Sequence, residues 1–127
     1  MNWPLFIAGL FAGLTTLGHF FVGSKSFLKP MLQASFDEVP KKVMHCVFHY
    51  VSAYLILSTI VLLAMGLGFN VKGDTTLLIR FIAIHYAAFA VTQIIIAVTS
   101  EIKGGIFKLF QWMFFVIIAV AAWLGVS

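Results

Sequence analysis

Four long apolar runs make up most of this chain of 127 residues, and each is long enough to cross a lipid bilayer as an α-helix. Crossing a hydrocarbon core of about 30 Å at about 1.5 Å per residue takes about 20 residues. The runs predict helices at approximately residues 4–23, 41–69, 76–99 and 105–126. Strands are disfavoured because the runs exceed strand length and do not alternate between apolar and polar residues.

The scarcity of charge excludes an ordinary soluble fold. Only 9% of the residues are charged and 62% are hydrophobic, whereas a soluble domain carries about 25% charge to wet its surface. The runs also contain too few polar residues to form a solvated stripe along each helix. The sequence therefore predicts an all-α integral membrane protein over residues 1–127, an up-down bundle of four transmembrane helices whose main partner is the lipid bilayer.

The connections between the runs differ in length and character. Residues 70–76 and 100–105 are short and contain glycine, so each predicts a tight turn between antiparallel neighbouring helices. The longest connection, residues 24–40, mixes large apolar side chains with lysines. That mixture is typical of a short amphipathic segment lying in the membrane interface, which we expect here.

Small residues recur at every fourth position in the first run. Gly9 and Gly13 form a G-x-x-x-G pattern, and Ala8 and Ala12 repeat the spacing one position earlier. Such spacing lets two helix backbones approach closely, so that van der Waals packing holds them together. We expect this contact to lie within the bundle in preference to a dimer interface.

The basic residues predict the orientation of the bundle. Six lysines fall on one side of the predicted membrane and only Lys72 and Arg80 fall on the other; the six are Lys25, Lys29, Lys41, Lys42, Lys103 and Lys108. By the positive-inside rule the lysine-rich side is cytoplasmic and both termini lie outside, and we expect a bacterial inner membrane. Because these cations sit at the ends of apolar runs, the formal net charge of +4 does not indicate a nucleic-acid partner. Lys25 and Lys29 would lie at headgroup level, where they serve as anchors or receive an anionic lipid or substrate head.

The four histidines are the polar residues that constrain function most, because polar side chains inside membrane helices are costly. His45 and His49 are four residues apart and share one helical face. His19, near the end of the first run, lies at a similar depth, so three imidazoles are expected around one point near the cytoplasmic face. Such a cluster suits a transition metal, with Glu101 as a candidate fourth ligand. Cys46 is a weaker candidate, since it points about 100° away from His45.

Two other interpretations use the same histidines. His19 and His49 on adjacent helices would suit the axial ligands of haem b, with nearby glycines making room for the macrocycle. A purely structural role, in which the imidazoles form hydrogen bonds between helices, is the preferred explanation for any one of them, and it explains all three together about as well as a cofactor site does.

A second polar set predicts a path through the bundle. It consists of His85, Thr92, Gln93, Thr99 and Gln111, with His85 and the two threonines expected on one inward face. These groups would serve a small channel or carrier subunit. Four helices enclose a narrow pore at best, so transport would require a homo-oligomer, and no acidic residue lies deep in the runs.

The sequence contains no glycine-rich phosphate loop, no G-x-S-x-G and no H-E-x-x-H, so it predicts no enzyme class. The leading hypothesis is a binding or redox-accessory protein that holds a metal or haem through His19, His45 and His49. The alternatives are the channel or carrier subunit and a structural subunit of a larger membrane complex.

Overall fold

The computed structural model describes residues 1–69 and 72–127, which form helices and connecting turns. Asn70 and Val71, part of the predicted turn 70–76, lie outside the described residues. In chain order the elements are α1 (Trp3–Gly18), the π-helix η1 (His19–Leu28), α2 (Lys29–Gln33), α3 (Glu38–Leu67), α4 (Thr76–Thr99), α5 (Gly105–Lys108) and α6 (Trp112–Leu124).

Three helices are long and apolar enough to cross a membrane: Trp3–Gln33, Glu38–Leu67 and Thr76–Thr99. The expectation of long apolar helices is therefore confirmed for three of the four runs. The fourth run folds as two pieces, α5 and α6, and α6 has 13 residues. A helix of that length rises only about 20 Å, which is less than the thickness of a hydrocarbon core.

The first helix is longer than the sequence predicts. α1, η1 and α2 form one continuous helix from Trp3 to Gln33. The segment 24–40, expected to be a separate interfacial element, is instead mostly the end of this helix, followed by a turn at residues 34–37. Pro30 lacks an N–H and its ring clashes with a carbonyl in the preceding turn of a regular α-helix. The wider turns of η1 precede it and let the helix continue past the proline.

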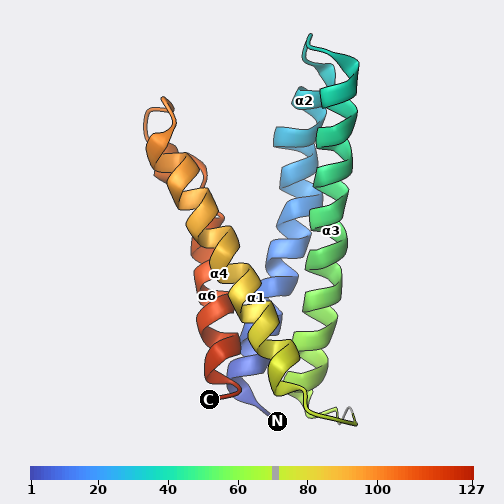
Figure 1. Ribbon diagram of the computed structural model, residues 1–127, viewed down its shortest axis with the longest axis vertical. Coiled ribbons are helices and arrows are strands. Elements are labelled where there is room, and N and C mark those ends of the chain that lie inside the picture. Colours follow the sequence, from blue (N-terminus) through green and yellow to red (C-terminus); the bar gives the residue numbers. More distant parts are fainter. Residues whose placement is uncertain (70–71) are drawn as a thin grey trace.

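Two antiparallel helix pairs build the molecule. α1 packs along α3, α4 packs along α6, and α1 also packs against α6 and so joins the pairs. Figure 1 shows both termini and the α3–α4 turn at one end, here called the closed end. α2 and the α4–α5 turn lie at the other end, where the two pairs diverge, here called the open end. α3 and α4 are antiparallel as predicted, and side chains such as Tyr54, which donates to the carbonyl of Ile82 at 3.4 Å, connect them.

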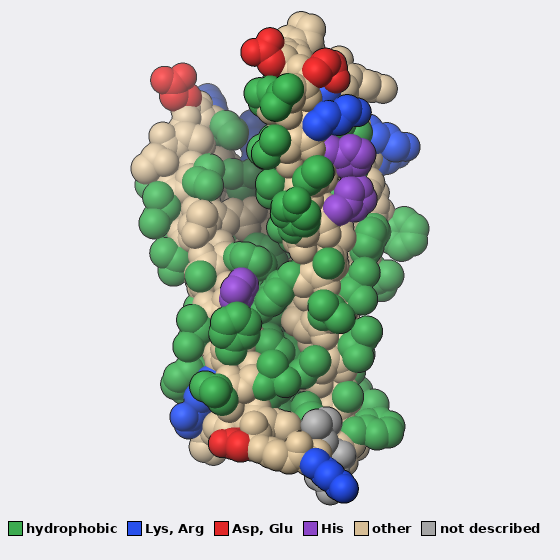
Figure 2. All heavy atoms as spheres, turned by 45° about the vertical axis from the view of Figure 1, so that its right-hand side comes forward, with side chains coloured by type: hydrophobic (Ala, Val, Ile, Leu, Met, Phe, Trp, Pro, Cys, Tyr) green, Lys and Arg blue, Asp and Glu red, His purple; other side chains and the backbone are tan. Residues whose placement is uncertain are grey.

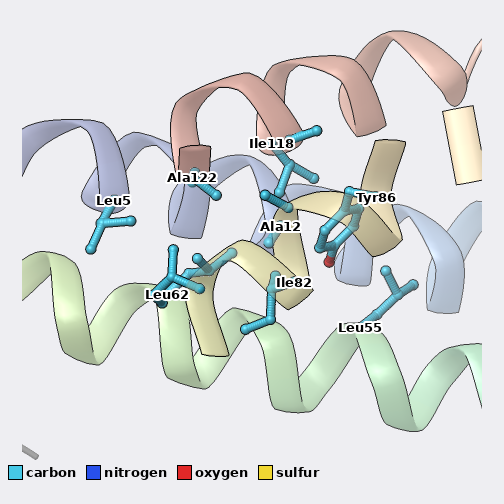
Figure 3. Packing of buried hydrophobic residues seen from close by; sticks show 12 residues of the cluster. Leu5, Ala12, Leu55, Leu62, Ile82, Tyr86, Ile118 and Ala122 are labelled. Atoms are coloured by element: carbon cyan, nitrogen blue, oxygen red, sulfur yellow. The ribbon is translucent and has the colours of Figure 1, made fainter. Parts of the chain in front are cut away.

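The core lies where the two pairs meet. Figure 3 shows side chains from α1, α3, α4 and α6 converging there; they include Leu5, Ala12, Leu55, Leu62, Ile82, Tyr86, Ile118 and Ala122. Glycines allow the closest approach: a Cβ at Gly9 would lie 2.8 Å from Leu63, and a Cβ at Gly66 would lie 2.5 Å from the backbone nitrogen of Phe6. The small residues of the first run therefore serve packing within the bundle, as expected.

The surface between the two ends is largely apolar. Figure 2 shows acidic and basic side chains gathered at the two ends of the molecule and hydrophobic side chains over the length between them. Many large apolar side chains are exposed there, among them Leu57 on α3 and Phe81 on α4. Soluble monomers rarely expose apolar patches of this extent.

Asn2 connects three helices at the closed end. Its Oδ1 accepts from the backbone N–H of Leu5 at 3.2 Å, its Nδ2 donates to the carbonyl of Gly125 at 2.8 Å, and its own backbone N–H donates to the carbonyl of Gly66 at 2.8 Å. Asn2→Ala removes both side-chain bonds, so we expect a loss of about 1–2 kcal/mol in the free energy of unfolding. Asn2→Ser keeps a capping oxygen and should lose less. Denaturant titration of the detergent-solubilised protein measures both, and an alanine variant as stable as the parent would contradict the assignment.

Candidate functional site

His45 and His49 form a close pair on the surface of α3. Because residues i and i+4 share a helical face, their rings approach to 5.0 Å between centroids and their Nε2 atoms lie 3.2 Å apart. His49 is exposed and His45 is half-buried. Figure 2 shows two adjacent histidine side chains on the surface near the open end, with basic side chains beside them. The pair therefore brings two imidazole nitrogens within hydrogen-bond distance of each other at an exposed position on α3.

His19 belongs to a separate contact between η1 and α3. Its ring stacks on Phe48 with the centroids 4.0 Å apart. Its Nε2 lies 2.8 Å from the hydroxyl oxygen of Ser52 and 3.2 Å from the carbonyl oxygen of Phe48. Ser52 is buried. The Nε2 of His19, a residue expected to bind a ligand, is therefore engaged in joining two helices.

The three imidazoles expected around one point do not converge. The His19 ring is held by Phe48 and Ser52, and among the described residues no hydrogen bond or ring contact joins it to His45 or His49. Glu101 is exposed in the turn between α4 and α5, on the other helix pair. Within residues 1–69 and 72–127, no group of three or more His, Cys, Asp or Glu side chains could hold a metal ion. The predicted site of His19, His45, His49 and Glu101 is not formed within one chain.

The same geometry gives no support to the haem b hypothesis. Bis-histidine ligation requires two imidazoles that face each other across a space wide enough for the macrocycle. His19 instead stacks on Phe48 inside the contact between η1 and α3, and the Nε2 of His49 meets that of His45. These two side chains do not form an axial pair, and haem b is not retained as a ligand.

The predicted polar track is interrupted. Thr92 and Thr99 are exposed, and the hydroxyl of Thr99 donates to the carbonyl of Ile95 in its own helix at 2.8 Å. These two threonines, which were expected to face inward, therefore lie on the outer surface of α4. The buried face of α4 carries other residues, namely Ile79, Ile82, Ala83, Tyr86, Ala90 and Ala97.

His85 packs among aromatic rings. It stacks on Tyr54 of α3 with the centroids 4.6 Å apart, and the rings of Phe81 and Phe89 lie at 5.0 and 5.4 Å. The ring is half-buried. This environment makes His85 a packing residue of the contact between α3 and α4.

Gln93 and Gln111 are brought together, at the interruption between α5 and α6. The Nε2 of Gln93 donates to the Oε1 of Gln111 at 2.6 Å, which ties α4 to the start of α6. The indole N–H of Trp112 donates to the carbonyl of Ile106 at 3.0 Å and satisfies a carbonyl at the break. The Oε1 of Gln93 is buried and has no partner among the described residues. The pair therefore lies where the fourth apolar run is interrupted.

Several residues that shape these contacts were not predicted. Tyr54 and Tyr86 carry hydroxyls inside apolar runs, and the reasoning that selected the histidines applies to them equally. The Tyr86 hydroxyl lies 2.7 Å from the hydroxyl of Ser58 in the buried core. Phe48 gave no such signal, because only the folded contact shows that its ring covers His19.

Comparison with known proteins adds no relative: the chain matches no protein-family model, no curated protein and no solved structure. Function must therefore be argued from the positions of the side chains. Of the predicted site residues, all of which the structure describes, His45 and His49 bring two polar atoms together on the surface.

Proposed function

We propose that this chain is a membrane-embedded accessory protein that binds a transition-metal ion through His45 and His49. Three long apolar helices and the apolar surface between two charged ends support membrane insertion (Figure 2). The open end carries most of the lysines, so the positive-inside rule places it on the cytoplasmic side. Both termini lie at the closed end (Figure 1) and would therefore face outside.

The metal proposal is carried by the separation of 3.2 Å between the two Nε2 atoms. At this separation one ring N–H donates a hydrogen bond to the other ring's nitrogen, and a bound ion would replace that proton. Two nitrogens bound at about 2.0–2.1 Å to a tetrahedral zinc ion lie about 3.3–3.4 Å apart. The pair therefore has nearly the spacing of two ligands on one ion, and the regular helix supplies it without a backbone change. Imidazole nitrogens suit zinc, copper and nickel.

The surroundings of the pair indicate an open site. A tetrahedral ion held by two imidazoles keeps two further coordination positions, which water or a second protein would have to fill. The neighbouring Lys41 is neutralised by Glu38, with 2.7 Å between its Nζ and the carboxylate oxygen. An exposed, two-ligand site supports holding or passing on a metal, in preference to an enclosed catalytic centre.

Metal titration of the detergent-purified protein tests the proposal. We expect one zinc or cobalt ion to bind for each histidine pair. His45→Ala and His49→Ala should each weaken metal binding at least about tenfold, because even the loss of a residue that only supports a ligand can have an effect of that size. Affinity should also fall as the solution is acidified, because protons and metal compete for the same nitrogens.

His85→Ala is the matched control, since the ring of His85 packs among Tyr54, Phe81 and Phe89 away from the pair. It should leave the metal affinity unchanged. Equal affinity in the parent and both His45→Ala and His49→Ala would contradict the proposal. Binding that appears only when another membrane protein co-purifies would instead support the structural-subunit hypothesis.

A further inference from the structure

An apolar groove lies between α4 and α6 toward the closed end. It has a volume of about 370 Å³, and its lining includes Ala83 and Ala87 from α4 and Ala119 and Trp123 from α6. The alanines leave open a strip that larger side chains would fill. The groove is open to the outside, where the membrane proposal places lipid.

The positively charged side chain of Arg80 lies beside this groove. Arg80 is one helical turn before Ala83, and its guanidinium carbon lies 5.6 Å from the centroid of the Trp123 ring, which lines the groove. Arg80 is exposed. Over the described part of the chain the one ion pair joins Lys41 and Glu38 near the open end, so Arg80 has no carboxylate partner there.

The acidic residue nearest in sequence is already engaged. The carboxylate of Asp74 accepts the backbone N–H of Thr76 at 2.8 Å, and this hydrogen bond holds the pKa of Asp74 below its ordinary value, with a smaller contribution from the nearby positive charge of Arg80. Among the described residues the two side chains form no ion pair. Arg80 is exposed beside Trp123, a residue type that marks the membrane interface, and its guanidinium makes no hydrogen bond or ion pair among the described residues.

We infer that this groove is a binding site for an anionic phospholipid, with an acyl chain along the apolar lining and the phosphate against Arg80. A planar guanidinium has paired N–H donors that match the oxygens of a phosphate. The lining of the groove is apolar, so it can pack against a hydrocarbon chain. The inference rests on the membrane insertion proposed above and is independent of the metal site.

Quenching of Trp123 by brominated lipids tests the site. Trp3→Phe and Trp112→Phe leave Trp123 as the single tryptophan of the three in the chain. The protein is reconstituted into mixed phosphatidylcholine and phosphatidylglycerol vesicles in which one lipid or the other carries brominated chains at equal mole fraction. We expect brominated phosphatidylglycerol to quench at least about twofold more strongly, as selective binding of an anionic headgroup requires.

Three variants separate the site from general attraction to anionic lipid. Arg80→Gln should abolish the preference, whereas Lys72→Gln, which removes the same charge at the same end, should preserve it. Ala87→Phe fills the groove and should reduce quenching by both lipids, with circular dichroism showing that the helices persist.

Equal quenching by the two lipids, or equal effects of Arg80→Gln and Lys72→Gln, would overturn the inference. Energy transfer between labelled copies, with quenching that falls as the protein-to-lipid ratio rises, would assign the groove to a second copy and overturn it as well. Failure of the protein to enter vesicles at all would count against membrane insertion itself, which distinguishes the two proposals.

Discussion

Tyr86→Ala is expected to lower the free energy of unfolding by about 3–5 kcal/mol, the usual cost of deleting a large aromatic side chain from a packed core. Tyr86 is 0% exposed and lies between the two helix pairs. Its ring contacts Tyr54 of α3 and Phe115 of α6, and its hydroxyl meets that of Ser58 at 2.7 Å. The variant would leave a cavity at the point where α3, α4 and α6 are held together.

Two further tyrosine variants make this prediction specific. Tyr50→Ala removes the same side chain at a position that is 69% exposed, so its effect should stay within about 0.5 kcal/mol. Tyr86→Phe removes only the hydroxyl and should lose about 1 kcal/mol, the size of one hydrogen bond. Reversible denaturation in detergent micelles, followed by circular dichroism, gives all three values. Similar losses for Tyr86→Ala and Tyr50→Ala would show that the core is not organised around Tyr86.

Gly66→Ala should have the second largest effect, a loss of about 3 kcal/mol or more from overpacking. A Cβ at Gly66 would lie 2.5 Å from the backbone nitrogen of Phe6 and 2.6 Å from its Cα. Backbone atoms cannot move aside as a flexible side chain can, so α1 and α3 must separate. The same separation would weaken the hydrogen bond from the Asn2 N–H to the Gly66 carbonyl, now 2.8 Å long.

Gly18→Ala is the matched control for this helix contact. Nothing lies within 4 Å of a Cβ built at Gly18, which is also in a helix. Alanine favours the helix over glycine by up to about 1 kcal/mol, so this variant should be neutral or slightly stabilised. The same denaturation experiment compares the two. If both alanines shift stability equally, the close contact between α1 and α3 is absent.

The local part of the candidate site could be predicted from the sequence. His45 and His49 come together because a helix brings residues four apart onto one face, whatever the rest of the chain does. The position of His19 could not be predicted in the same way. Its ring is fixed by Ser52 and Phe48 across a helix contact, and the spacing of residues along one helix does not encode such a contact.

The facing of α4 shows where sequence reasoning reaches its limit. In a soluble helix the polar face marks the outside, but a helix surrounded by lipid is apolar on every side and carries little signal of which face is buried. Thr92 and Thr99 are expected from the sequence to face inward because polar groups are costly in hydrocarbon, and both are exposed. Tyr86 and Ala90 lie on the buried face of α4, but their polarity does not distinguish that face from the exposed one.

The sequence by itself determined that the chain forms long apolar helices with charge at their ends, because hydrophobic length and charge position are properties of each segment alone. It also determined the histidine pair on α3. Tertiary structure alone decided how far the first helix extends, where the fourth run breaks, and which polar groups meet. Those outcomes depend on contacts between residues distant in sequence, such as Gln93 with Gln111 and His19 with Ser52, and short-range patterns do not contain them.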